Sequence, residues 1–542
     1  MRRRLLSSFR RCALHWAFLL VLPAAPGLAQ ETLPGFVVHF DFIRNAAEGC
    51  ALVNIAQQAG AKVIDVVPPA RVWDHPESLA ALDAILAEIE KRGMKLTFTR
   101  IDAAYLPEGG KPRKYYLYDH MLNQRGRLPN KQKTDAYFLT TVGVHGYAEW
   151  MEEETRFYAK HYGKLPHLIG INLGPFSEPF SAERCGFLEY LLKTDRYEIT
   201  QYTRPAAEVW HRWLAAHFAD VQTLNREYGL RVKSFEAVVL PLNEKDPRFK
   251  RGDLVYFDFV RCLGDWYLER YERCRRIWHE VSGRPEVPFI LQFSGFVAEK
   301  FAAGRPAYVA FDLPAWIASA DAVGLSVYTH NGYRDLGHAS LQATVQMLAL
   351  ARDMGKQAFV LEGGCEAPNV VLDPVQLAFF GSVARPLAPR TYIYEYLKDK
   401  FNEAYATNPG KLVTGDGQIR PAAIEALKNL FRGIETSASP ELPAPRLCLE
   451  VDLDDCRRNP RTGQLNAALF EVAAQLPLRW VPKGLNLPAY GKIPTVHSDG
   501  SLANGSPELE ALFAQIPEVG SLERQAWTTR LLAILGPGGS SR

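Results

Sequence analysis

One stretch decides the fold: Leu341-Gln-Ala-Thr-Val-Gln-Met-Leu-Ala-Leu-Ala-Arg-Asp-Met354-Gly355-Lys-Gln357-Ala-Phe-Val-Leu-Glu362. Residues 341–354 have a helical pattern, and Gly355 is the residue type that most often ends a helix. Residues 357–362 follow as a short, nearly continuous apolar run, which is typical of a strand buried on both faces of a parallel sheet. The stretch therefore predicts a helix that leads back into a buried parallel strand.

The same alternation of strand and helix repeats along the chain. The other candidate strands are residues 36–42, 61–67, 94–100, 168–173, 288–293, 322–328 and 391–396. A second helix is predicted over Glu77–Gly93, where good helix formers end at a glycine. Eight strand–helix units predict an α/β fold, a closed (β/α)8 TIM barrel. An open doubly wound sheet is the alternative, but no Gly-x-Gly-x-x-Gly follows the first strand to support a nucleotide-binding version.

Two connections of the predicted barrel are long. They are residues 105–167 after the third strand and residues 175–287 after the fourth. Active sites on this fold are built from the loops at the carboxyl ends of the strands. Long insertions at that end therefore predict a cleft for a large substrate.

The chain divides into five predicted segments. These are a signal peptide (1–29), the barrel (30–436), a Pro- and Ser-rich linker (437–445), a small C-terminal α/β module (446–535) and a disordered tail (536–542). The first segment joins a basic start, a short apolar run and small residues before Gln30, which is typical of secretory signals. We therefore expect a secreted or periplasmic protein without stable membrane insertion after cleavage; an uncleaved N-terminal anchor is the alternative.

Charge and cysteine content narrow the partners. The 63 Lys and Arg residues nearly balance the 60 Asp and Glu residues, so no nucleic-acid partner is expected. Cys262 and Cys274 lie in one helical pattern, roughly 18 Å apart along its axis, which excludes a bridge if the helix is continuous. Cys448 and Cys456 are close enough in sequence for a local disulfide. No Cys or His cluster has zinc spacing, so neither a metal nor another cofactor is expected, and the oligomeric state stays open.

Glu178 and Glu362 are the candidate pair of catalytic carboxyl groups. Glu178 follows the fourth predicted strand in Gly174-Pro-Phe-Ser-Glu-Pro179, and Glu362 ends the seventh in Phe359-Val-Leu-Glu-Gly-Gly364. Hydrolysis of a glycosidic bond takes two carboxyl groups, one to protonate the leaving oxygen and one to attack the anomeric carbon or activate a water. A Glu that ends an apolar strand is costly to bury without a function or a partner. A structural ion pair with an Arg is the alternative for each.

Three segments carry a resemblance to known enzymes. The stretch Gly170-Ile-Asn-Leu-Gly-Pro-Phe-Ser-Glu-Pro-Phe180 resembles the β-amylase segment in which a Gly-Pro turn leads into the acid Glu. Trp213-Leu-Ala-Ala216 and Val221-Gln-Thr-Leu-Asn-Arg-Glu-Tyr-Gly229 resemble the region after the fourth strand of family 42 β-galactosidase-like enzymes. Over residues 35–435 the chain thus resembles the clan A glycoside hydrolases, family 42 first and the β-amylases more distantly.

The resemblance implies an exported glycoside hydrolase that cleaves O-glycosidic bonds of an oligo- or polysaccharide. It assigns Glu178 as the acid/base and Glu362 as the nucleophile. It also places Tyr328 where clan members have a Tyr that hydrogen-bonds the nucleophile. The remaining candidate substrate-binding residues lie at or beside strand ends: Asp41, Trp73, Arg100, Ser177, His330 and Asn331.

Ser177 stands where most clan members have an Asn that binds the substrate's 2-hydroxyl, which argues against galactose as the sugar. Retention of configuration is favoured because Glu362 sits directly at its strand end; Glu366 is the candidate base if the enzyme inverts. A catalytically inactive carbohydrate-binding protein is the alternative function, and Ser177 motivates it. A metal-dependent hydrolase is a third reading, because His39 and Asp41 alternate on the first strand, but later strands lack the matching ligands.

Overall fold

The apolar runs of the sequence form eight parallel strands. These are β1 (Leu33–His39), β2 (Val63–Val67), β3 (Lys95–Thr99), β4 (Leu168–Asn172), β5 (Ile290–Phe293), β6 (Ala322–Asn331), β8 (Gln357–Cys365) and β9 (Thr391–Tyr394). The computed structural model describes residues 32–40, 43–69, 72–99, 147–172, 204–241, 246–293, 313–331, 334–335, 346–365, 387, 389–394, 412–414, 417–436, 445–451, 478–483, 491–497, 500–517 and 521–535. Each predicted strand therefore has a counterpart in the structure.

The strands close on themselves into a barrel. Their order is β4-β3-β2-β1-β9-β8-β6-β5, and a parallel bridge between Ile171 and Phe289 joins the two ends. The Ile171 N–H donates to the carbonyl of Pro288 at 3.1 Å across this seam. The short β7 (Arg334–Asp335) pairs antiparallel with the end of β6. The predicted (β/α)8 barrel is confirmed, and the open doubly wound sheet is wrong.

The first strand begins earlier than its apolar pattern predicts. Residues 36–42 were expected, whereas β1 spans Leu33–His39. Leu33 and Pro34 lie opposite Thr391 and Tyr392 of β9, so pairing with the last strand extends β1 backward. Sequence periodicity carries no information about this pairing, because its partner lies more than 350 residues away.

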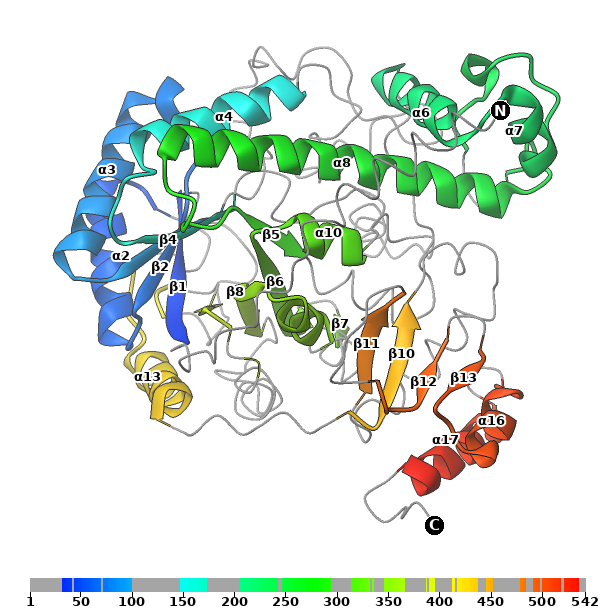
Figure 1. The fold of residues 1–542 in the computed structure, drawn as a ribbon. Coiled ribbons are helices and arrows are strands. Elements are labelled where there is room, and N and C mark those ends of the chain that lie inside the picture. Colours follow the sequence, from blue (N-terminus) through cyan, green and yellow to red (C-terminus); the bar gives the residue numbers. More distant parts are fainter. Residues whose placement is uncertain are drawn as a thin grey trace. The chain divides into compact units, whose positions relative to one another are not determined.

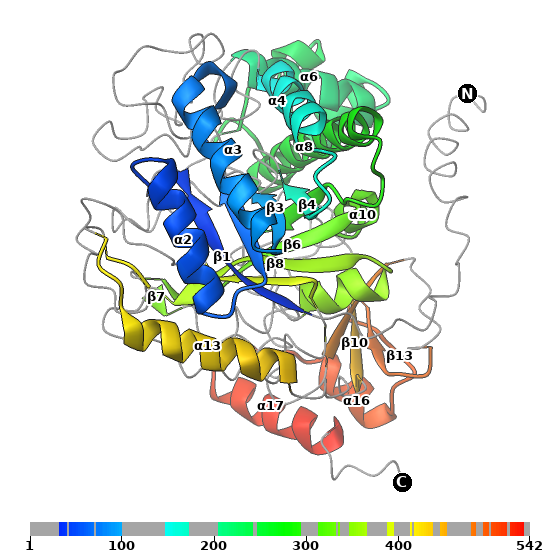
Figure 2. The same cartoon turned by 90° about the vertical axis from the view of Figure 1, so that its left-hand side faces the viewer.

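Helices cover the outside of the barrel. The helices of the described residues are α2 (Ala46–Gln58), η2 (Val72–Asp74), α3 (Pro76–Lys91), α4 (Tyr147–His161), α6 (Arg204–His217), α7 (Val221–Tyr228), η4 (Phe235–Ala237), α8 (Gly252–Ser282), α10 (Leu313–Ser319), α13 (Pro421–Thr436), α16 (Pro507–Phe513) and α17 (Leu522–Leu535). The helix predicted over 77–93 is α3, and Gly93 takes the left-handed conformation, φ 66°, just after its end. Figure 2 shows α2 and α3 side by side over the outer face of the first strands.

The long helix α8 contacts the barrel near its C-terminus and α7 near its N-terminus. Toward its C-terminus, Tyr271 Oη donates to the carbonyl of Phe289 at 2.5 Å and Trp278 Nε1 donates to that of Val287 at 3.0 Å, which fastens it to the start of β5. Toward its N-terminus, Asp258 accepts from Tyr228 Oη of α7 at 2.7 Å. In Figure 1 this helix runs on to α6 and α7, so the insertion after β4 is built on one continuous helix. Cys262 and Cys274 lie in this one helix as free thiols, so the bridge between them that a continuous helix excludes is not formed.

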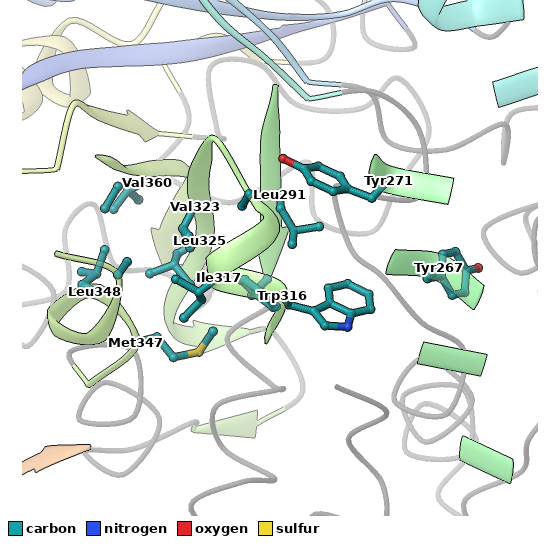
Figure 3. Packing of buried hydrophobic residues seen from close by; sticks show 14 of the residues in the cluster. Tyr267, Tyr271, Leu291, Trp316, Ile317, Val323, Leu325, Met347, Leu348 and Val360 are labelled. Carbon is teal, nitrogen blue, oxygen red and sulfur yellow. The ribbon is translucent and has the colours of Figure 1, made fainter. Parts of the chain in front are cut away.

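Side chains alternate between two apolar layers along the strands. Leu291, Val323 and Val360 face outward and pack with Trp316 of α10 and with Met347, as Figure 3 shows. Met347 lies in the helical segment 346–353 that precedes β8. Their sequence neighbours Ile290, Ala322, Phe359 and Leu361 form a separate cluster inside the barrel. Successive side chains of a strand therefore point alternately toward the surrounding helices and into the lumen.

A second sheet follows the barrel. Its strands are β10 (Leu447–Val451), β11 (Leu478–Pro482), β12 (Thr495–Val496) and β13 (Leu502–Ala503), in the order β11-β10-β12-β13. Cys448 is a buried, free thiol on β10, so the local disulfide to Cys456 is not formed. The predicted signal peptide, nearly all of the linker and the tail lie outside the described residues.

Across the part of the chain that the structure describes, none of the helices combines the length and the apolarity that a bilayer span requires.

Asp321 fastens α8 to the amino ends of two strands. It accepts hydrogen bonds from His279 Nε2 at 2.6 Å, Arg275 Nη1 at 2.9 Å and the Phe289 N–H at 3.1 Å. Burial alone would raise the pKa of Asp321, but the bonds from His279 and Phe289 and the charge of Arg275 outweigh burial and lower it below its usual value. The ionised carboxylate is therefore the form that holds this junction.

We expect Asp321→Ala to lower the free energy of unfolding by about 3 kcal/mol at pH 7, because it leaves the half-buried Arg275 guanidinium and His279 imidazole without this acceptor. Since the folded pKa is depressed, the contribution is present above the unfolded pKa of about 3.9 and is lost as pH falls through the folded value. Urea unfolding at pH 7 and pH 3.5 measures both effects. Glu208→Ala removes an exposed partner of Arg204 and serves as the control. Equal losses in the two variants would contradict the assignment.

Candidate active site

Polar side chains enter the lumen toward the carboxyl ends of the strands. The buried ones are His39 on β1, Asp65 on β2, Thr97 and Thr99 on β3, Asn172 on β4, Gln292 on β5 and Glu362 on β8. Burying such groups is costly unless they are paired, so their concentration at one end of an apolar barrel needs a reason. It is also the end at which barrels of this kind carry their active sites.

A break in strand register turns Glu362 toward the lumen. In the pairing of β6 with β8, Leu325 lies opposite Val360 and the next residue, Ser326, lies opposite Glu362, so Leu361 is passed over. Leu361 packs in the lumen against Ile290, and Glu362 also reaches the lumen, where it contacts Gln292. In a regular strand Glu362 would point to the opposite face from Leu361. The bulge therefore places the carboxylate inside.

Two amides link Glu362 to the opposite side of the seam between β4 and β5. Gln292 Nε2 donates to Glu362 Oε2 at 3.4 Å. Asn172 Nδ2 donates to Gln292 Oε1 at 2.6 Å. Asn172 and Gln292 are fully buried, and Asn172 Oδ1 has no hydrogen-bond partner among the described residues. The chain of bonds holds the Glu362 carboxylate from the barrel wall.

Asp65 is a second carboxyl group in the lumen. Its Oδ1 accepts from Thr97 Oγ1 at 2.6 Å and from Thr99 Oγ1 at 3.0 Å, while its Oδ2 lacks a partner within the described ranges. Burial raises the pKa of Asp65 well above its usual value, the two Thr bonds lower it, and the charge of Glu362 raises it further. Asp65 is thus biased toward its neutral, protonated form.

Apart from Trp73, the predicted site residues divide into three groups. Glu362 lies in the lumen, as described above. Tyr328, His330 and Asn331 lie in the last four residues of β6, where Tyr328 pairs with Gly364 and His330 with Cys365; the structure describes the backbone of these residues and not their side chains. The third group, Asp41, Arg100, Ser177, Glu178 and Glu366, lies outside the described residues.

Trp73 is placed beyond the end of β2, in η2. Its ring lies 4.6 Å from that of Phe157 on α4, with the two planes tilted by 37°. The side chain is half-buried in this contact. Trp73 therefore packs against α4.

Gly363 also has a structural role. A Cβ atom there would lie 2.9 Å from the ring and hydroxyl of Tyr392 on β9. We expected the Gly363-Gly364 pair to admit a ligand beside the carboxylate; the close neighbour that the structure shows at Gly363 is Tyr392. The glycine lets β9 approach the bulge that presents Glu362.

Sequence reasoning missed Asp65, Asn172 and Gln292 as parts of this site. One signal was available: Asp65 and Gln292 each interrupt an otherwise apolar strand, Val63-Ile-Asp-Val-Val67 and Ile290-Leu-Gln-Phe293. Within the described ranges, no grouping of His, Cys, Asp or Glu side chains is suited to hold a metal ion.

We expect Asp65→Asn to stabilise the protein, increasingly so as pH rises above about 4. The raised pKa means that the folded state retains a proton that the unfolded chain releases, so Asp65 costs stability as pH rises from the unfolded value through the folded one. Each unit of pKa difference corresponds to about 1.4 kcal/mol. Urea unfolding at pH 5 and pH 8 tests this, with the exposed Asp74→Asn as control. A loss of stability at pH 8 would show that Asp65 is needed as an ionised group.

No family model matches this chain, and no curated protein matches it in sequence. Solved structures do match. The β-galactosidase from the psychrophilic Marinomonas ef1 is 17% identical with a TM-score of 0.62, covering 88% of this chain and 73% of that one. The cold-adapted β-galactosidase from Rahnella sp. R3 is 13% identical with a TM-score of 0.63, covering 87% of this chain and 68% of that one.

A β-amylase matches more distantly. The catalytic domain of the enzyme from Paenibacillus polymyxa is 11% identical with a TM-score of 0.53, covering 76% of this chain and all of that one. A GH42 β-galactosidase from G. stearothermophilus is 14% identical with a TM-score of 0.62. The predicted resemblance to family 42 enzymes first and to β-amylases second is confirmed at the level of the fold. The chain therefore has the barrel fold that these glycoside hydrolases share.

Proposed function

We propose that this protein is an exported O-glycosidase that acts on an oligo- or polysaccharide. The observation that carries the proposal is the placement of Glu362: a buried carboxylate, turned into the lumen by a bulge at the carboxyl end of β8 and held there by a buried amide. The fold is one that hydrolases of glycosides use.

The reaction that these groups support proceeds in two displacements. Glu362 attacks the anomeric carbon, and its new C–O bond forms as the glycosidic C–O bond breaks. Glu178 gives its proton to the leaving oxygen, and then takes a proton from the water that releases Glu362. Two inversions at one carbon give net retention. This route needs the two carboxyl groups about 5–5.5 Å apart.

The buried lumen suits Glu362 to the role of nucleophile. Burial biases Asp65 toward its neutral form, and a neutral Asp65 does not repel a charge on Glu362. The amide of Gln292 donates to one oxygen and leaves the carboxylate oriented across the lumen. We assign the binding of the sugar hydroxyls to residues that the sequence places at or beside the carboxyl ends of strands, with Trp73 as a surface for stacking on a sugar ring. These residues are Asp41, Arg100, Ser177, Tyr328, His330 and Asn331.

We expect Glu178→Gln and Glu362→Gln each to lower kcat/KM on responsive aryl glycosides at least about 100-fold, because each removes a proton donor or a nucleophile. The measurement is product release by residues 30–542 from a panel of aryl glycosides and polysaccharides. Glu208→Gln, an exposed Glu on α6, is the matched control and should leave turnover unchanged. NMR of the first anomer released distinguishes retention from inversion by Glu366.

Turnover that survives both substitutions would rule out the assignment of the carboxyl pair. Silence of the parent across the panel, together with tight binding of an intact glycan in calorimetry, would support the second function, a carbohydrate-binding protein without catalysis. Ser177, in place of the Asn of most clan members, is the observation that favours this second function.

We propose that residues 1–29 direct export and are removed before Gln30. When the full chain is made in a bacterial host, the exported protein is expected to begin at Gln30 by N-terminal sequencing. Leu20→Arg interrupts the apolar run and should keep the full-length chain in the cytoplasm. Full-length protein that sediments with membranes would instead identify an uncleaved anchor.

A further inference from the structure

We propose that Gln292 is a positioning residue for Glu362, and that Asn172 sets the direction in which Gln292 acts. The inference rests on the proposed function, since it concerns how the nucleophile is held. It goes beyond that function in assigning the support of the carboxylate to two amides on β4 and β5.

The direction of the chain follows from what each group can donate. An ionised carboxylate only accepts, so Gln292 must present its NH2 to Glu362. The Gln292 carbonyl oxygen is then turned toward Asn172, which must present its own NH2. The 2.6 Å contact between Asn172 Nδ2 and Gln292 Oε1 meets this requirement. If the Gln292 amide were flipped, its oxygen would face the Glu362 oxygen, and two NH2 groups would face each other.

Backbone features make this reach possible. Gln292 is on β5 and Glu362 is on β8, and β6 lies between these strands in the sheet. The lumen position of β6 at this level is Gly324, where a Cβ atom would lie 3.2 Å from Gln292 Cβ and 2.8 Å from Leu361 Cδ1. A larger residue would crowd the path of Gln292 across β6. Gly324 and the bulge at Leu361 therefore allow the Gln292 amide to reach the Glu362 carboxylate.

Titratable groups surround this contact. Asp65 faces the lumen from β2 and His39 ends β1 on the lumen side, while Tyr392 of β9 contacts Gly363. Burial raises the pKa of Asp65 and the charge of Glu362 raises it further, so negative charges on these two carboxyl groups oppose each other. Gln292 donates an N–H to Glu362, and such a donor favours the ionised carboxylate.

The test compares Gln292→Met and Asn172→Leu with the parent in kcat, KM and the pH profile of kcat/KM. Gln292→Met keeps the volume and removes the donor. Asn172→Leu is close in volume but has no donor for the Gln292 oxygen, so the Gln292 amide is no longer held with its NH2 toward Glu362. For both, kcat is expected to fall about 10- to 100-fold with KM nearly unchanged, and the acidic limb to move to higher pH. Gln346→Met, at a buried Gln whose Oε1 lacks a partner in the described part of the chain, is the matched control and should change neither.

A second readout does not depend on activity. At pH 7 the shifts in thermal unfolding midpoint for Gln292→Met and Glu362→Gln should be non-additive in the double variant, whereas Gln346→Met and Glu362→Gln should add. Additive shifts for the first pair, or an acidic limb that stays in place in an active Gln292→Met or Asn172→Leu protein, would overturn the positioning role. Non-additive shifts in a parent that hydrolyses no glycoside would uphold it and overturn the proposed function alone.

Discussion

The closed parallel sheet imposes the constraint on which the rest of this structure depends. Each strand is buried on both faces, with helices outside and the lumen inside, so the described lumen side chains, which are buried, have little bulk water for their hydrogen bonds. Apolar pairs such as Ile290 and Phe359 meet this condition without cost. A polar residue must find its partner across the barrel, and this is why Asn172, Gln292 and Glu362 form one chain of bonds.

Small departures from ideal backbone geometry convert this closed lumen into a site. The bulge at Leu361 reverses the side to which Glu362 points, and Gly324 leaves room for an amide from two strands away. Gly363 lets β9 come close to the same bulge. Each feature weakens the regular ladder or packing of a strand. Their convergence around a single carboxylate is better explained by the demands of a reaction than by those of folding.

Electrostatics in the lumen favours one charge at a time. Asp65 and Glu362 influence each other, and burial pushes Asp65 toward its neutral form. The stability cost of holding such groups together is typical of sites that trade stability for chemistry. At the opposite end of the barrel, Asp321 has the reverse environment, since hydrogen bonds from His279, Arg275 and a backbone N–H lower its pKa and fasten α8 to the strands. The same residue type therefore carries a candidate chemical role at one end and a structural role at the other.

The sequence by itself determined the barrel, because period and length of apolar runs report local burial. All eight strands, the helix followed by Gly93 and the strand that carries Glu362 could be predicted from it, although β8 continues three residues beyond Glu362 to Cys365. Only the tertiary structure decided what surrounds that carboxylate. Asn172, Gln292 and Asp65 stand 190, 70 and 297 residues from Glu362 along the chain, and no local pattern encodes which of them meet. Closure of the barrel and a one-residue bulge place Gln292 against Glu362 and Asn172 against Gln292, and both features depend on pairing between distant strands.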